Sequence, residues 1–408
     1  MDKTKKTKIF LFLSIVNTIM VNAQTINSGE LSVKQGTIFS SSASFDNAAG
    51  GDVLNDGTLI LYSDYRNDGL MGFSAGSGTG MVHFKGSAGV QTISGSIISR
   101  FNNVRFDNSK ARPAFLLSAD ISIMGYADFS KGIVENSSYP GAVIFEKDAT
   151  HDHAGNDSYV SGFAERNQNG LFEFPIGDGG YFRPCSIGEA ASQNGIFRCR
   201  YLLKNSNLLF PHSQKEAKIH IIGNTEYWEF ESSQKNIETA LTLTWSESTT
   251  PADIIENKQG TTLAVVRWDE KEKNWHALPT ALDSDSKKAV AAVKEDGVYT
   301  LGRVFSETAD DLIIYNALSP NEDGFNDYLR IDGLEVFPDN TLEIYNRWGV
   351  KVYETSGYGL NNNFFRGFSE GRATFNKGER LPSGTYFYVL TYKNTGRTKE
   401  KAGYLYIN

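Results

Sequence analysis

Residues 24–158 consist of very short apolar runs separated by Gly, Asn, Asp and Ser, for example at 59–61, 115–117 and 142–145. No stretch keeps an apolar period of about 3.6 residues through three turns, so helices should be nearly absent. Strands this short, joined by turns this frequent, indicate a β-solenoid or an irregular β-sandwich. The pattern yields no strict repeat length.

Residues 159–305 show longer apolar runs and clearer alternation. The residues that alternation places on one face of a predicted strand are Ile237, Thr239, Leu241, Leu243 and Trp245. A turn at 177–180 has three glycines, and a charged turn separates the apolar runs 264–268 and 275–278, so both segments read as hairpins. This region is predicted to be an antiparallel β-sandwich.

The polar segment 306–311 marks the next boundary, and the C-terminal domain is assigned to residues 310–408. Two further hairpins are expected there, with turns at 346–349 and 393–401. Several strands in so short a stretch predict a compact β-sandwich. Trp348, in the first turn, is expected to pack across its hairpin against Tyr345 or Tyr386, with a binding hot spot as the alternative.

The N-terminus has the pattern of a signal peptide. A cationic stretch at residues 3–8 precedes an uncharged apolar run at 9–21 and a small-x-small site that ends at Ala23. The run is shorter than the ~20 residues that span a bilayer, so cleavage after Ala23 is expected, giving a signal peptide at 1–23. No later apolar run suggests a transmembrane segment.

Charge and cysteine content narrow the function further. A net charge of -8 argues against nucleic acid as a partner, because that binding needs clustered Lys and Arg. Residues 24–158 hold nine Lys and Arg against fourteen Asp and Glu, which weakens the case for an enzyme acting on acidic polysaccharide. Cys185 and Cys199 are the only cysteines. They are predicted to form a disulfide between neighbouring strands, with two buried free thiols as the alternative.

Two motifs that suggest chemistry have simpler explanations. Residues 72–76 match the Gly-x-Ser-x-Gly pattern of a hydrolase nucleophile, but more glycines follow where that site needs a helix, so a turn is favoured. His151 and His153, with Asp157, carry groups that bind zinc. No further ligand of fixed spacing accompanies them, and a solvated loop is favoured.

An oxygen-rich segment near the C-terminal boundary is a weak candidate for calcium. Its ligands would be Asn321, Asp323 and Asp327, with Asn326 beside them, and Gly324 permits a sharp turn. The distal Glu of an EF-hand is missing, and Asx-turns explain the same residues without an ion. No other cofactor is indicated.

Four motifs in the C-terminal region occur in a recognisable order, at 319–327, 342–349, 352–354 and 381–388. From residue 315 onward the chain resembles the gliding motility-associated C-terminal domain, the type B sorting domain of the type IX secretion system. The resemblance implies an Ig-like β-sandwich and export to the cell surface or the medium. It also implies the type IX machinery and outer-membrane docking proteins as partners. The segment 359–375 departs from the family's usual shorter turns.

Upstream, residues 159–162, 174–184 and 226–228 resemble segments of large surface proteins that carry this sorting domain, a resemblance that implies no activity. The leading hypothesis is therefore a non-enzymatic exported protein, adhesive or structural, whose ligand would be a glycan or another surface protein. The rival is a carbohydrate-active hydrolase or lyase, motivated by the solenoid-like region.

Overall fold

The computed structural model describes residues 23–86, 89–167, 170–188, 195–233, 239–256, 258, 260–305, 312–369, 378–394 and 397–408. Within these residues the fold is all-β, as predicted, with the short helical elements α1 (Ala252–Ile255), η1 (Ser206–Leu208) and η2 (Leu334–Val336). The predicted signal peptide lies outside the described residues, apart from Ala23. In the described part of the chain, no helix is long and apolar enough to cross a membrane.

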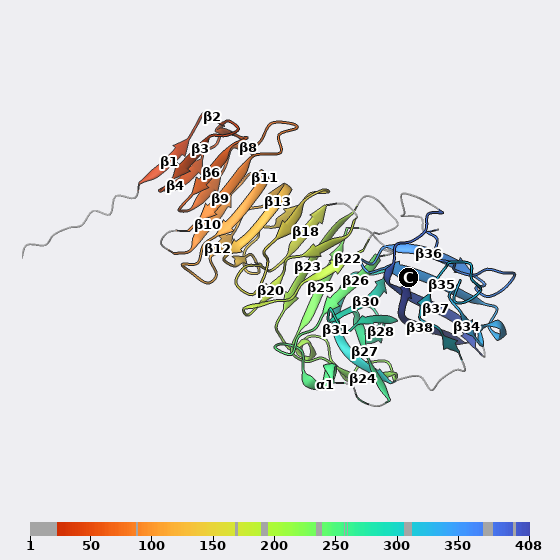
Figure 1. The fold of residues 1–408 in the computed structure, drawn as a ribbon. Coiled ribbons are helices and arrows are strands. Elements are labelled where there is room, and N and C mark those ends of the chain that lie inside the picture. The colour runs from red at the N-terminus through yellow and green to blue at the C-terminus, as the bar shows by residue number, and fades with distance from the viewer. Residues whose placement is uncertain are drawn as a thin grey trace, which may run out of the picture.

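The N-terminal region is a β-solenoid, whose parallel strands stack turn upon turn (Figure 1). One sheet contains β1 (Gln24–Asn27), β4 (Ser44–Asn47), β7 (Tyr65–Asn67), β10 (Gln91–Gly95), β12 (Phe115–Leu117), β14 (Val134–Glu135) and β17 (Val160–Ser161). A second contains β2 (Glu30–Val33), β5 (Asp52–Asn55) and β8 (Leu70–Gly72). The third contains β3 (Ile38–Ser41), β6 (Thr58–Leu61), β9 (Met81–Lys85), β11 (Ser99–Asp107), β13 (Ile121–Lys131) with β16 (Thr150–Asp152), β15 (Val143–Phe145) and β18 (Ala164–Asn167). The solenoid alternative of the sequence prediction is confirmed.

The turns of the solenoid differ in length, which explains why no strict repeat is visible in the sequence. Gln24 pairs with Ser44, a step of 20 residues. Tyr65 pairs with Ile93, a step of 28 residues. A ladder of asparagines marks the first regular turns: Asn27 Nδ2 donates to Asn47 Oδ1, and Asn47 Nδ2 donates to Asn67 Oδ1, both at 2.8 Å.

The third solenoid sheet continues directly into the middle region. β18 pairs in parallel with β15 on one side and antiparallel with β23 (Ile196–Leu202) on the other. The antiparallel part goes on through β25 (Tyr227–Ser232), β31 (Gly297–Phe305) with β24 (Ile219–Ile222), β27 (Thr261–Asp269) and β28 (Asn274–Ala277). One hydrophobic core, from Phe45 to Leu301, therefore spans both sides of residue 158.

A second antiparallel sheet completes the middle sandwich. It consists of β19 (Phe172–Phe174), β22 (Cys185–Ile187), β26 (Thr239–Thr244), β30 (Lys288–Val293) and β29 (Thr280–Asp283). The glycine-rich hairpin of β20 (Gly177–Asp178) and β21 (Tyr181–Phe182) is present, and Gly179 and Gly180 at its turn have φ values of 60° and 90°. β26 is buried on both faces, not on one as the alternation predicted.

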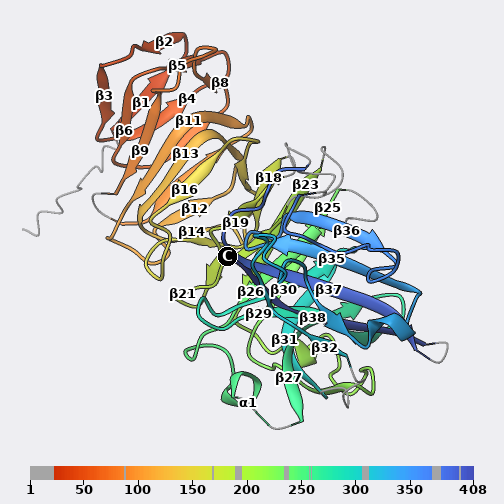
Figure 2. The same cartoon turned by 45° about the vertical axis from the view of Figure 1, so that its right-hand side comes forward.

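The C-terminal domain covers the second face of β26. Its five-stranded sheet contains β33 (Ala317–Leu318), β38 (Arg397–Ile407), β37 (Gly384–Asn394), β35 (Asn340–Asn346) and β36 (Lys351–Ser356). One face packs on the domain's own core beneath the pair β32 (Ile313–Ile314) and β34 (Ile331–Asp332). The opposite face meets the middle sandwich (Figure 2) in a cluster formed by Ala240, Ala281, Val290, Tyr345, Phe387 and Val389.

Candidate functional site

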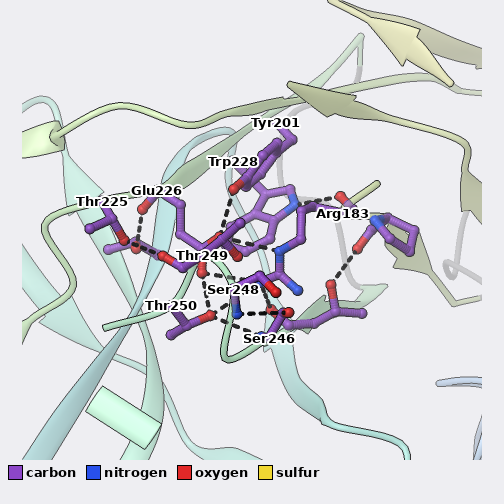
Figure 3. A network of polar contacts seen from close by, with 12 residues as sticks. Arg183, Tyr201, Thr225, Glu226, Trp228, Ser246, Ser248, Thr249 and Thr250 are labelled. Carbon is purple, nitrogen blue, oxygen red and sulfur yellow. Dashed lines mark hydrogen bonds and ion pairs between the residues drawn. The ribbon is translucent and has the colours of Figure 1, made fainter. Parts of the chain in front are cut away.

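The most organised polar cluster is a buried ion pair in the middle sandwich (Figure 3). Arg183 directly follows β21, and Glu226 directly precedes β25. Their exposed fractions are 3% and 1%. Arg183 Nε donates to Glu226 Oε2 at 3.2 Å and Nη2 donates to Oε1 at 3.1 Å, so the pair is bidentate.

Neighbouring side chains use the remaining hydrogen-bonding capacity of both charged groups. The Tyr201 hydroxyl donates to Glu226 Oε2 at 2.7 Å, and the Thr250 hydroxyl donates to Oε1. Arg183 Nη2 also donates to the carbonyl of Thr244 at 2.7 Å. Burial, together with the adjacent Glu226 carboxylate, raises the pKa of Tyr201. The guanidinium lies 5.4 Å from the ring centroid of Trp228.

This cluster is suited to holding the fold together. The Glu226 carboxylate accepts four hydrogen bonds within the protein and is sealed from solvent. Thr225 Oγ1 donates to the carbonyl of Thr249, which ties the loop before α1 to the same point. The cluster joins the segments 174–184 and 226–228, which lie far apart in the sequence. The signal that could have paired these segments is a charged residue beside aromatic residues in each, Arg183 in the first and Glu226 in the second.

The two cysteines lie in facing sheets, not in neighbouring strands as predicted. Cys185 is in β22, which pairs with β19 and β26, whereas Cys199 is in β23, which pairs with β18 and β25. Their sulfur atoms are 2.7 Å apart across the core, and both are buried free thiols in the structure. Burial raises the pKa of Cys199. The disulfide stays a prediction, and it would link the two facing sheets of the sandwich.

The two histidines do not converge on one ligand site. His151 packs between Phe129, Phe145 and Phe172, and its Nε2 lies 2.6 Å from a backbone carbonyl, so the solvated loop expected for it is wrong. Burial lowers the pKa of His151. His153 Nδ1 instead contacts a carboxylate oxygen of Asp128 at 2.9 Å. No group of three or more potential metal ligands occurs among the described residues.

The candidate calcium segment forms a chain of Asx-turns. Asp323 accepts from the backbone N–H of Phe325, which lowers the pKa of its carboxyl. The two carboxylate oxygens of Asp327 accept from the N–H groups of Glu322 and Gly324, at 2.7 and 2.8 Å. Asn321 donates to Asp323 at 2.8 Å. The loop's own backbone thus engages the oxygens on which the calcium hypothesis depends.

The Gly-x-Ser-x-Gly segment is a solenoid turn. It follows β8 without a helix, and Gly76 has a φ of 79°. The Ser74 hydroxyl donates to Asp56 Oδ2 at 2.6 Å, a bond between successive turns of the solenoid. This agrees with the turn favoured from the sequence.

A groove of about 680 Å³ lies on the side of the solenoid beside the sheet of β2, β5 and β8. Leu70 and Met124 form part of its apolar lining, and their exposed fractions are 65% and 43%. Arg100, Asp52 and Glu146 supply charge along it. The groove therefore presents apolar surface with charged groups of both signs.

Trp348 does not pack across its hairpin. Its exposed fraction is 48%, and the guanidinium of Arg347 lies 4.2 Å from its ring centroid. Gly349 has the predicted positive φ, at 77°. The turn abuts the middle sandwich so closely that a Cβ built on Gly188 would lie 2.2 Å from the carbonyl oxygen of Gly349. The core-packing prediction for Trp348 is wrong, because the turn lies over the sandwich and the indole stays in solvent.

Comparison with known families identifies the C-terminal domain. Residues 312–407 match the CHU_C type IX secretion signal domain. No curated protein and no solved structure matches the chain. The predicted sorting domain is confirmed, and the protein is cargo of the type IX machinery, which exports it across the outer membrane to the surface or the medium.

Proposed function

From the type IX sorting domain at residues 312–407, we propose that residues 24–305 are a non-enzymatic adhesive or structural passenger. The general secretory route delivers it to the periplasm after cleavage at Ala23. The type IX translocon and outer-membrane docking proteins then recognise the C-terminal domain. The match at residues 312–407 supports the export route.

The solenoid groove supports a binding role for the passenger. Its apolar lining at Leu70 and Met124 and the exposed residue Arg100 suit an extended ligand with both apolar and anionic groups. A glycan of the cell surface or a segment of another surface protein has this chemistry. The groove's position on the rigid solenoid keeps it preformed.

Two experiments test the proposal. Residues 310–408 fused behind a periplasmic reporter should carry it to the surface or the medium, and the same fusion without β38 should stay periplasmic.

The chain 24–408 should then bind on a glycan array, and Met124→Asp should abolish binding while Leu208→Asp, on remote η1, leaves it intact. The protein applied to the array keeps its sorting domain, because truncation at residue 305 would expose the apolar cluster around Ala240.

One observation favours the rival function. Asp52 and Glu146 line the same groove, and most glycosidases act with two carboxyl groups. A hydrolase would release new reducing ends from a bound polysaccharide and lose that activity in Glu146→Gln. Binding without turnover supports the passenger proposed above.

A further inference from the structure

The first turn of the solenoid has an open edge on all three of its faces. β1, β2 and β3 each pair with the next turn, and each ends its sheet among the described residues. Repeat proteins normally cover such an end, because unpaired N–H and C=O groups are a template for further strands. Here Ile26 and Ile38 stand 60% and 71% exposed beside the open edge.

The hydrogen-bonding direction of this edge can be read from the bonds to the next turn. The carbonyl of Gly29, which precedes β2, accepts from the N–H group of Asp52. The carbonyl of Val33, the last residue of β2, accepts from the N–H group of Asp56. Alternate residues of a strand point their polar groups to opposite sides, so Glu30 and Ser32 direct theirs to the open edge. The same reasoning applies to β1 and β3, where the carbonyls of Asn27 and Ser41 accept from the next turn.

We propose that the first turn of the solenoid is a dimerisation surface for a second copy of this chain, joined head to head. A two-fold axis through Ser32 pairs β2 with its own copy and β1 with β3, all antiparallel. In this register Glu30 of each copy lies opposite Lys34 of the other, so the dimer contains two pairs of opposite charges. The same register sets Ile26 opposite Ile38, which covers both exposed side chains.

A second copy fits better than a growing filament. At the opposite end of the solenoid the third sheet continues into the middle sandwich through β18 and β23, so that end offers no edge open on all three faces to match the first turn. Only an isologous contact then closes the edges of both molecules. Cleavage after Ala23 would make Gln24, the first residue of β1, the N-terminus, leaving no preceding segment to cover the edge. Figures 1 and 2 place this turn far from the C-terminal sheet, so the dimer would carry a sorting domain at each distal end.

Sedimentation velocity on the chain 24–408, with its first residue verified by intact mass, tests the proposal without any ligand. Its outcome is therefore independent of the proposed passenger function. A concentration-dependent dimer is expected. Glu30→Lys should weaken it several-fold, and Glu30→Lys with Lys34→Glu should restore it to within about twofold. Ile26→Asp should leave a monomer, whereas Leu70→Asp, equally exposed on β8, should leave the dimer unchanged.

Cross-linking tests the register directly. Residues opposite in a hydrogen-bonded antiparallel pair have Cα atoms about 5.5 Å apart, within disulfide range. In Ser32→Cys, oxidised glutathione should take two electrons from the two facing thiols, forming an intermolecular disulfide and releasing reduced glutathione. Ser40→Cys should not cross-link, because that position faces Gln24 of the other copy.

Several results would overturn the proposal. A chain 24–408 that stays monomeric at high micromolar concentration would do so, as would a dimer insensitive to Ile26→Asp or a double charge swap that fails to restore pairing. A monomeric exported chain that retains residues 1–23 would assign the open edge to that segment instead.

Discussion

Replacing Glu226 by Gln should destabilise the middle sandwich strongly. The substitution keeps the side chain's size, and the amide oxygen can still accept from a hydroxyl, but Arg183 loses the only carboxylate that the structure places against it among the described residues. Both side chains are nearly sealed from water, so no solvent replaces the missing charge.

The magnitude follows from that burial. Breaking a buried ion pair by removing one partner costs about 3–5 kcal/mol, because the other charge stays buried and uncompensated. For a unit of this size, that corresponds to a fall in Tm of roughly 6–20 °C. Removing both charges with Arg183→Met and Glu226→Gln should recover part of the loss, since the unpaired cation is gone.

Urea unfolding followed by tryptophan fluorescence measures the effect, because Trp228 Nε1 donates to the Arg183 carbonyl and reports on the site. The matched control is Glu247→Gln, which removes an exposed ion pair with Lys287 and should leave the midpoint unchanged. A Glu226→Gln midpoint equal to that of the control would refute the structural role assigned to the cluster.

Three further outcomes are expected. Non-reducing peptide mapping of the exported chain should recover Cys185 and Cys199 as a disulfide, and two alkylatable thiols after unfolding would contradict this. Trp348→Ala should leave Tm unchanged because the indole is exposed, while reduced export by cell fractionation would assign it to translocon recognition. His151 has a folded pKa lowered by burial, so the unfolded chain binds the proton more readily and stability should fall as pH drops below about 6.5. His151→Phe should narrow the difference in Tm between about pH 7.5 and about pH 5, and an unchanged difference would locate the pH sensitivity elsewhere.

The sequence predicted the class of each region because strand length and turn frequency are local properties. It did not yield the solenoid period, since steps between paired residues range from 18 for Asp52 and Leu70 to 28 for Tyr65 and Ile93. One regular signal was nevertheless present: Asn27, Asn47 and Asn67 recur every 20 residues, and their side chains form the inter-turn ladder. Reading asparagine spacing alongside apolar spacing would have located the first turns.

The errors arose where tertiary contacts decide what a side chain faces. Alternation in β26 predicted one polar face, but the C-terminal domain covers that face at Ala240. Trp348 lies in an aromatic-rich domain, yet its turn rests against Gly188 of the sandwich and leaves the indole outside. Cys185 and Cys199 are only 14 residues apart, but the intervening chain crosses from one sheet to the other.

The buried ion pair also ties together two segments that lie far apart in the sequence. A fold that buries Arg183 after the glycine-rich hairpin must supply a carboxylate at the same depth, and the chain does so 43 residues later at Glu226. The aromatic neighbours Tyr201 and Trp228 then exclude water and hold the pair in register. Neither charged group is accessible to a ligand, so this cluster supports the sandwich, and a ligand of the passenger would instead be met on the solenoid that precedes it.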